Sequence, residues 1–169
     1  MIRLFCIKIT TKYFKVYSLN LPCFSHLFKI DKRLNTIFDP FRKKHVKLTP
    51  EEWVRQNFLQ YMIHELGFPE GLLSVEMGLS LNGLSRRCDI VAFDNFGKAR
   101  VIVECKAPTV KITQKTFDQI SAYNLKLKVD FLIVTNGLNH YCCKMDYTKN
   151  SYAFLEEIPK YDFVVSAEK

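Results

Sequence analysis

Two apolar segments, residues 85–94 and 98–107, flank the short turn at Asn95, Phe96 and Gly97. Turn-forming residues between two such segments predict a β-hairpin. Apolar residues fill successive positions in both arms, such as 90–93 and 101–103, so both faces of the hairpin are expected to be buried. A hairpin of this kind must be covered by further elements on both sides, which constrains the chain to a layered fold.

The surrounding sequence predicts the covering elements. Thr49 can cap a helix, Pro50 suits its first position, Glu52 completes a T-x-x-E capping box, and Gly67 supplies a stop. Residues 72–82 predict a strand, 113–127 a helix, 129–137 a buried parallel strand and 139–146 a further strand, whereas 152–163 are ambiguous. Residues 17–48 predict a small hairpin or a wrapping segment. The order indicates a mixed-sheet α/β domain over 48–169 with at least one parallel crossover.

Charge is unevenly distributed along the chain. Lys and Arg total 25 against 17 Asp and Glu, a net charge of +8. Residues 1–47 hold eleven basic and two acidic residues, whereas the remainder holds 14 basic and 15 acidic residues. We therefore expect residues 1–47 to form a basic arm with an anionic partner, nucleic acid first and a membrane surface second.

Targeting and cysteine patterns favour a cytoplasmic protein. Lys8, Lys12 and Lys15 interrupt every candidate apolar run near the start, so no signal peptide is expected. No run approaches the ~18–20 apolar residues of a membrane span, and we expect no membrane insertion. The six cysteines contain no C-x-x-C pair, so reduced, packed cysteines are expected.

Two carboxylates are predicted to face each other in the hairpin. If residues 95–98 form a four-residue loop, Asp89 lies opposite Glu104, and alternation places Lys106 on the face of Glu104. Opposed carboxylates repel each other, and a divalent cation between them would explain their placement. A solvated hairpin face is the alternative, and a slip of one residue would reverse the faces. Cys88 and Cys105 are opposite in the same register, as a disulfide or as reduced core residues.

These residues resemble a known nuclease signature. Asp89, followed after fourteen residues by Glu104-Cys105-Lys106, is similar to the D…(D/E)-x-K motif of the PD-(D/E)XK nuclease superfamily, with Cys88 in place of the usual proline. Gln119 and Tyr123 resemble its Q-x-x-x-Y motif. Residues 48–146 resemble the N-terminal nuclease domain of type I restriction enzyme R subunits.

The resemblance implies a restriction-endonuclease-like mixed β-sheet flanked by helices and a metal-dependent DNA endonuclease. Asp89 and Glu104 would bind Mg²⁺, for which Mn²⁺ could substitute, together with the backbone carbonyl of Cys105. Lys106 would position the attacking water. Other restriction-modification subunits would be partners. The sequence contains no G-x-x-x-x-G-K-[ST], so the ATPase motor of these R subunits is not expected in this chain.

Further residues follow from the same resemblance. Gln119 and Tyr123 would contact the DNA backbone or support the site. A glutamate of the first helix would join the metal site, and Glu52 or Glu51 matches by place, although the capping box already accounts for Glu52.

Four basic residues are candidates for DNA contact by their position near the motif, and a solvated surface is the alternative for each: Arg86, Arg87, Lys111 and Lys115. His140 is interpreted as structural. The alternative function is a catalytically inactive nuclease-fold module that binds nucleic acid or a restriction complex.

Overall fold

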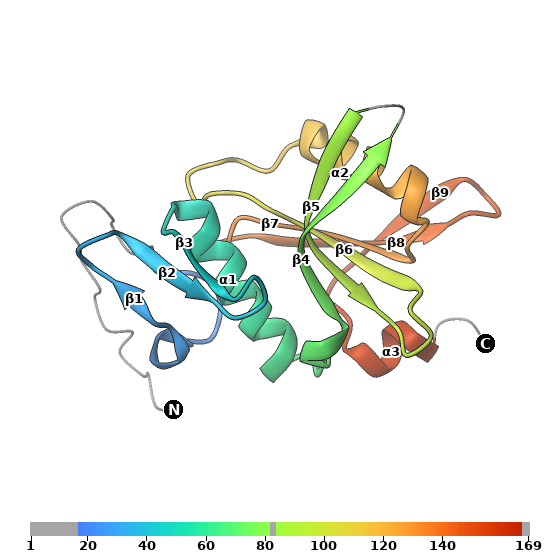
Figure 1. Ribbon diagram of the computed structural model, residues 1–169. Coiled ribbons are helices and arrows are strands. Elements are labelled where there is room, and N and C mark those ends of the chain that lie inside the picture. Colours follow the sequence, from blue (N-terminus) through green and yellow to red (C-terminus); the bar gives the residue numbers. More distant parts are fainter. Residues whose placement is uncertain (1–16, 82–83, 167–169) are drawn as a thin grey trace.

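The computed structural model describes residues 17–81 and 84–166 (Figure 1). The first sixteen residues of the predicted basic arm lie outside the described residues, as do Asn82 and Gly83 at the predicted strand end. The described strands form a three-stranded sheet in the order β1-β2-β3 and a six-stranded sheet in the order β4 to β9. This is a mixed α/β architecture with helices on the larger sheet, as the sequence predicts.

The first strands and helix are β1 (Ile30–Asp31), β2 (Thr36–Asp39), β3 (Lys44–Lys47) and α1 (Pro50–His64). The central hairpin and the strand before it are β4 (Leu73–Leu81), β5 (Leu84–Phe93) and β6 (Ala99–Cys105). The remaining elements are α2 (Gln114–Leu127), β7 (Phe131–Thr135), β8 (His140–Asp146), β9 (Ser151–Leu155) and α3 (Tyr161–Ser166). The segment 152–163, which the sequence leaves ambiguous, thus contributes an edge strand and the start of a short helix.

Helix α1 begins as its capping residues predict, but Glu52 departs from the capping box. The Thr49 side chain accepts a hydrogen bond from the Glu52 N–H at 3.1 Å, and Pro50 is the first helical residue. The Thr49 N–H donates to the Lys47 carbonyl, so it does not need the Glu52 side chain. The Glu52 carboxylate is therefore available for other partners. After the helix, Gly67 takes a φ of 73°, a left-handed conformation that favours glycine and redirects the chain.

The register of the central hairpin is the predicted one, although its turn differs. Ile90 pairs with Val103 and Ala92 with Val101, as a pairing of Asp89 with Glu104 requires. At the turn, Phe93 pairs with Ala99, and Arg100 is the extra residue of a β-bulge. The Asp94 carboxylate accepts hydrogen bonds from the N–H groups of Phe96 and Lys98, which stabilises a loop one residue longer than predicted. Because the bulge compensates for this residue, the register beyond it is unchanged.

Helices cover both faces of the six-stranded sheet, as Figure 1 shows. One core packs α1 and α3 against the sheet, through residues such as Phe58, Val103 and Val164. The other packs α2 on the opposite face, through residues such as Ile120 and Val134. Helix α2 connects β6 to β7, which pair in parallel, so the predicted crossover is present. All seven residues of β6 are buried, in agreement with the sequence pattern.

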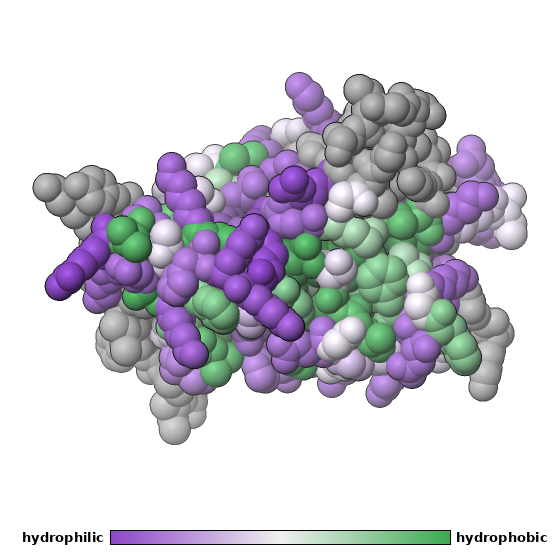
Figure 2. Space-filling model, viewed as in Figure 1, coloured by the Kyte–Doolittle hydropathy of each residue, from purple (hydrophilic) through white to green (hydrophobic). Residues whose placement is uncertain are grey.

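The three-stranded sheet packs beside α1. Ile37 and Trp53 are buried in a third core cluster, and the Trp53 indole N–H donates to the Tyr17 carbonyl at 3.1 Å. Figure 2 shows hydrophilic residues over this part of the molecule. Its exposed basic residues are Lys29, Lys32, Arg33, Lys43, Lys44 and Lys47. Much of the positive charge of residues 17–47 is thus carried on the surface of a folded sheet.

The cysteines agree with the expectation of reduced, packed thiols. Cys88 and Cys105 are free thiols, and they pack in different cores on opposite faces of the sheet. Among the described residues, no helix is long and apolar enough to cross a membrane.

We predict that Arg100→Leu will strongly destabilise the fold. The buried guanidinium forms ion pairs with Asp94 at 3.6 Å and Asp130 at 2.8 Å, and it donates to the Val164 carbonyl at 3.0 Å. Its loss leaves buried Asp94 without this charge, which costs about 3–5 kcal/mol. Urea unfolding measures the change. Lys149→Ala removes an exposed cation as a control, and equal midpoints for the two variants would contradict this account.

Candidate active site

Asp89 lies in β5, at the point where β5 stops pairing with β6. Its side chain contacts Arg55 of α1. Pairing between the two strands ends at Ile90 and Val103, one residue before Asp89 and Glu104. The Asp89 carboxylate accepts a hydrogen bond from the Cys105 N–H at 2.6 Å through Oδ2 and one from Arg55 Nη2 at 2.7 Å through Oδ1. The end of β6 and helix α1 thus each supply one hydrogen-bond donor to this carboxylate.

Glu104 and Lys106 form the second part of the site. Lys106 Nζ donates to Glu104 Oε1 at 2.6 Å, and the Lys106 N–H donates to the Thr135 carbonyl, which extends the contact with β7. Burial and the negative charge of Asp89 raise the pKa of Glu104 to about 7, although Lys106 opposes this shift. Burial disfavours the charged Lys106, but its hydrogen bond with Glu104 outweighs this and raises the Lys106 pKa. Lys106 is therefore a cation near neutral pH.

The two glutamates at the start of α1 have different surroundings. Glu52 is buried and binds Arg42, Arg55 and Gln56, so its carboxylate is held between α1 and the loop after β2. Glu51 is half-exposed, and burial together with the charge of Asp89 raises its pKa, against the effect of Arg55 and Lys106. Of the two sequence-based candidates, Glu51 is thus influenced by the charge of Asp89, whereas the Glu52 carboxylate is held by Arg42, Arg55 and Gln56.

Arg55 and Glu76 are two residues of the site that the sequence analysis does not identify. Arg55 Nη2 lies 2.7 Å from Asp89 Oδ1, 2.9 Å from Glu76 Oε1 and 3.7 Å from Glu51 Oε1. Its Nη1 binds Glu52. The i, i+3 and i, i+4 spacing of Glu52 and Glu51 to Arg55 is a signal that could have identified it. Glu76 leaves no such signal, because it reaches the site through a backbone irregularity in β4.

Oxygen donors suited to a hard divalent cation are present at the strand ends. Among residues 17–81 and 84–166, no group of three or more His, Cys, Asp and Glu is arranged to hold a metal ion. Mg²⁺ needs fewer protein ligands, since it is typically bound through one or two carboxylates with water and phosphate. The carboxylates of Asp89 and Glu104 and the carbonyl of Cys105 are donors of this chemical type. Buried carboxylates of like charge also favour a cation, because it relieves their repulsion.

The other predicted contact residues are less fully described. Gln119 and Tyr123 lie in α2, but their side chains are outside the described part of the structure, as is that of Arg86 in β5. Arg87 is exposed and pairs with Glu76 at 2.8 Å. Lys111, in the segment between β6 and α2, and Lys115, in the first turn of α2, are both exposed.

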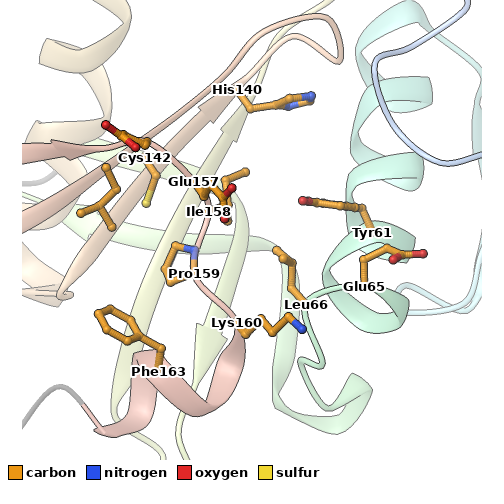
Figure 3. Close-up of a pocket in the computed structure, with 12 residues that line it drawn as sticks. Tyr61, Glu65, Leu66, His140, Cys142, Glu157, Ile158, Pro159, Lys160 and Phe163 are labelled. Atoms are coloured by element: carbon orange, nitrogen blue, oxygen red, sulfur yellow. The ribbon is translucent and has the colours of Figure 1, made fainter.

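A large cavity lies away from these residues, between α1 and the segment after β9 (Figure 3). Its volume is about 1050 Å³, and its lining includes Tyr61, Glu65, Glu157 and Phe163. None of the predicted site residues with a described side chain lines it. His140 at its rim is held at both ring nitrogens, by the Thr135 hydroxyl at 2.8 Å and the Asn20 carbonyl at 3.0 Å, as a structural histidine would be.

The pKa of Glu104 provides a test of the charge arrangement. In metal-free protein, we expect carbon-detected NMR to place it near 7. Asp89→Asn should lower it by removing a like charge, and Lys106→Met should raise it by removing a cation. The folded state thus favours the protonated carboxyl, a contribution to stability that is lost as pH rises from about 4.5 through 7. An unchanged value in Asp89→Asn would contradict the proximity of the two carboxylates.

A solved structure shares this fold. The chain matches a structure assigned to an HsdR subunit of a type I restriction enzyme from Vibrio vulnificus YJ016, with a TM-score of 0.53 and 18% sequence identity. The match covers 69% of this chain and 24% of that one, so the chain spans about a quarter of its length. At this identity the likeness concerns the fold alone.

Sequence comparison identifies the family. No match was found among curated proteins. A family model described as the type I restriction enzyme R protein N terminus matches residues 50–159, which include α1, the central hairpin and α2. Because this match spans well over half of the chain, the protein belongs to the family of type I restriction enzyme R protein N-terminal domains.

Proposed function

We propose that the domain is a metal-dependent deoxyribonuclease that hydrolyses phosphodiester bonds. The observation that carries this proposal is the meeting of Asp89, Glu104 and Lys106 where β5 and β6 separate, with Lys106 Nζ 2.6 Å from Glu104. Two acidic oxygen donors and a neighbouring cation suit metal-assisted phosphodiester hydrolysis. Membership of the restriction enzyme family supports the assignment.

Each residue has a role that its surroundings favour. Asp89 and Glu104 would hold Mg²⁺ or Mn²⁺ with the Cys105 carbonyl, and Glu51 at the edge could add a carboxylate. The bound metal would supply Lewis-acid activation of the phosphate and of the attacking water. Lys106, which its neighbours keep protonated, would orient that water and stabilise negative charge on the phosphate. Gln119 and Tyr123 would contact the DNA backbone from α2 or support the site.

DNA would be attracted by the exposed basic residues. Lys111 lies on the segment that leaves the site after β6, Lys115 lies in the first turn of α2, and Arg87 lies two residues before Asp89. The basic surface of β1–β3 would add sequence-independent attraction to phosphates, which weakens as salt increases. Other subunits of a restriction-modification system are the proposed protein partners.

One observation favours the second candidate, an inactive nuclease-fold module that binds nucleic acid or a restriction complex. Both Asp89 oxygens already have partners within the protein, in Arg55 and the Cys105 N–H. When protein groups already neutralise or hydrogen-bond the carboxylates, the folded site does not need a metal ion to be stable. Metal-independent DNA binding without cleavage by any divalent cation would identify this module.

The nuclease proposal predicts that Asp89→Ala and Lys106→Ala will each reduce plasmid cleavage by about 10²-fold or more, because each removes a group that acts on the reacting phosphate. Nicking and linearisation with Mg²⁺ are followed on agarose gels. Asp162→Ala and Lys149→Ala make the same chemical changes at exposed positions and should cleave as wild type does. Equal nicking by all four variants would attribute the activity to a contaminant and reject the assignment.

A further inference from the structure

Arg55, which contacts Asp89, is a buried charged residue that has no role in the proposed chemistry. Arg55 lies on the buried face of α1, and its side chain is only 6% exposed. It contacts carboxylates from three separate elements: Glu52 of its own helix, Glu76 of β4 and Asp89 of β5. Burying a cation among several carboxylates costs free energy through desolvation. Ion pairs offset this cost only when their geometry is good.

The strand opposite Asp89 is distorted toward this arginine. Val75 pairs with Ile90 and Met77 with Cys88, so Glu76 and Asp89 occupy opposing positions between these pairs. Glu76 has a φ of 55°, in the left-handed region that residues with side chains rarely adopt. Such a conformation inside a strand costs free energy and is kept where neighbouring contacts impose it. Here it accompanies the approach of the Glu76 carboxylate to the same Nη2 that binds Asp89.

Glu76 is well suited to hold Arg55. Its Oε1 lies 2.9 Å from Arg55 Nη2, and its Oε2 accepts a hydrogen bond from Arg87 Nη1 at 2.8 Å. Burial would raise the pKa of Glu76, but Arg87, Arg55 and Arg42 outweigh it and lower the pKa, so the carboxylate stays charged. Glu52 fixes the other terminal nitrogen of Arg55. Glu52 and Glu76 therefore hold the Arg55 guanidinium independently of its contact with Asp89.

We propose that Arg55 is a positioning residue that sets the orientation of Asp89, and that Glu76 in turn holds Arg55. With Oδ1 held by Arg55, the Oδ2 atom of Asp89 is directed to the Cys105 N–H, which ties α1 to the end of β6. This inference rests on the proposed function for its catalytic consequence. The orientation itself is a property of the metal-free protein.

The direct test is amide hydrogen exchange of Cys105 in the metal-free protein, followed by NMR. Arg55→Met and Glu76→Gln should each accelerate exchange of this amide by about tenfold or more, because Asp89 is then free to rotate away from it. Arg55→Lys retains the charge but not the planar fork, and it should also accelerate exchange. The Val103 amide in the same strand should be unaffected.

Glu70→Gln is the matched control, because it makes the same change at an exposed carboxylate next to β4. Should Arg55→Met fail to fold, Glu76→Gln carries the test, since Glu76 is partly exposed. Unchanged Cys105 exchange in Glu76→Gln and Arg55→Lys would overturn the proposal. Equal acceleration at Cys105 and Val103 would also overturn it, because that result indicates general loss of stability.

The catalytic consequence is measured separately. Loss of a residue that orients a metal ligand typically costs 10–100-fold in activity or metal affinity. For Arg55→Met we expect single-turnover cleavage to fall by about this factor while Mn²⁺ affinity does not weaken, because a nearby positive charge is removed. Cleavage and Mn²⁺ affinity that both equal those of wild type would overturn the catalytic part of the positioning role. If wild type neither binds Mn²⁺ nor cleaves DNA, the proposed function fails, whereas the exchange result still decides the orientation of Asp89.

Discussion

The arrangement of the site depends on how buried carboxylates of like charge are balanced. Asp89 and Glu104 lie at the separating ends of two central strands, where burial and mutual repulsion raise the pKa of Glu104. The protein offsets this cost with two cations from different elements, Arg55 from α1 beside Asp89 and Lys106 from the end of β6 beside Glu104. The packing of α1 against the sheet is thus coupled to the charge of the site.

Ion pairs also connect the three-stranded N-terminal sheet to the site. Arg42, in the loop between β2 and β3, binds both Asp39 and Glu52. Glu52 in turn binds Arg55, which binds Asp89. A chain of alternating charges therefore runs from the three-stranded sheet through α1 to the central hairpin. Residues 17–47 consequently contribute ion pairs to this network as well as positive charge to the surface.

Much of the fold could be predicted because it depends on local patterns. The cap at Thr49, the parallel strand after α2 and the register beyond the hairpin turn follow from alternation and capping chemistry. The loop length could not be predicted, since the Asp94 carboxylate stabilises an extra residue that the bulge at Arg100 absorbs. The difference between Glu51 and Glu52 depends on Arg42, which comes from a separate sheet. The role of Glu76 depends on a backbone angle that the sequence does not show.

The proposed chemistry requires that Asp89 and Glu104 share a divalent metal ion. The most direct measurement is anomalous diffraction from crystals of the wild-type protein grown with Mn²⁺. We expect one peak within coordination distance of both carboxylates and of the Cys105 carbonyl, with the Arg55 guanidinium still bound to Glu76. A map with no peak there, and with the Lys106 ammonium or the Arg55 guanidinium between the two carboxylates, would contradict it.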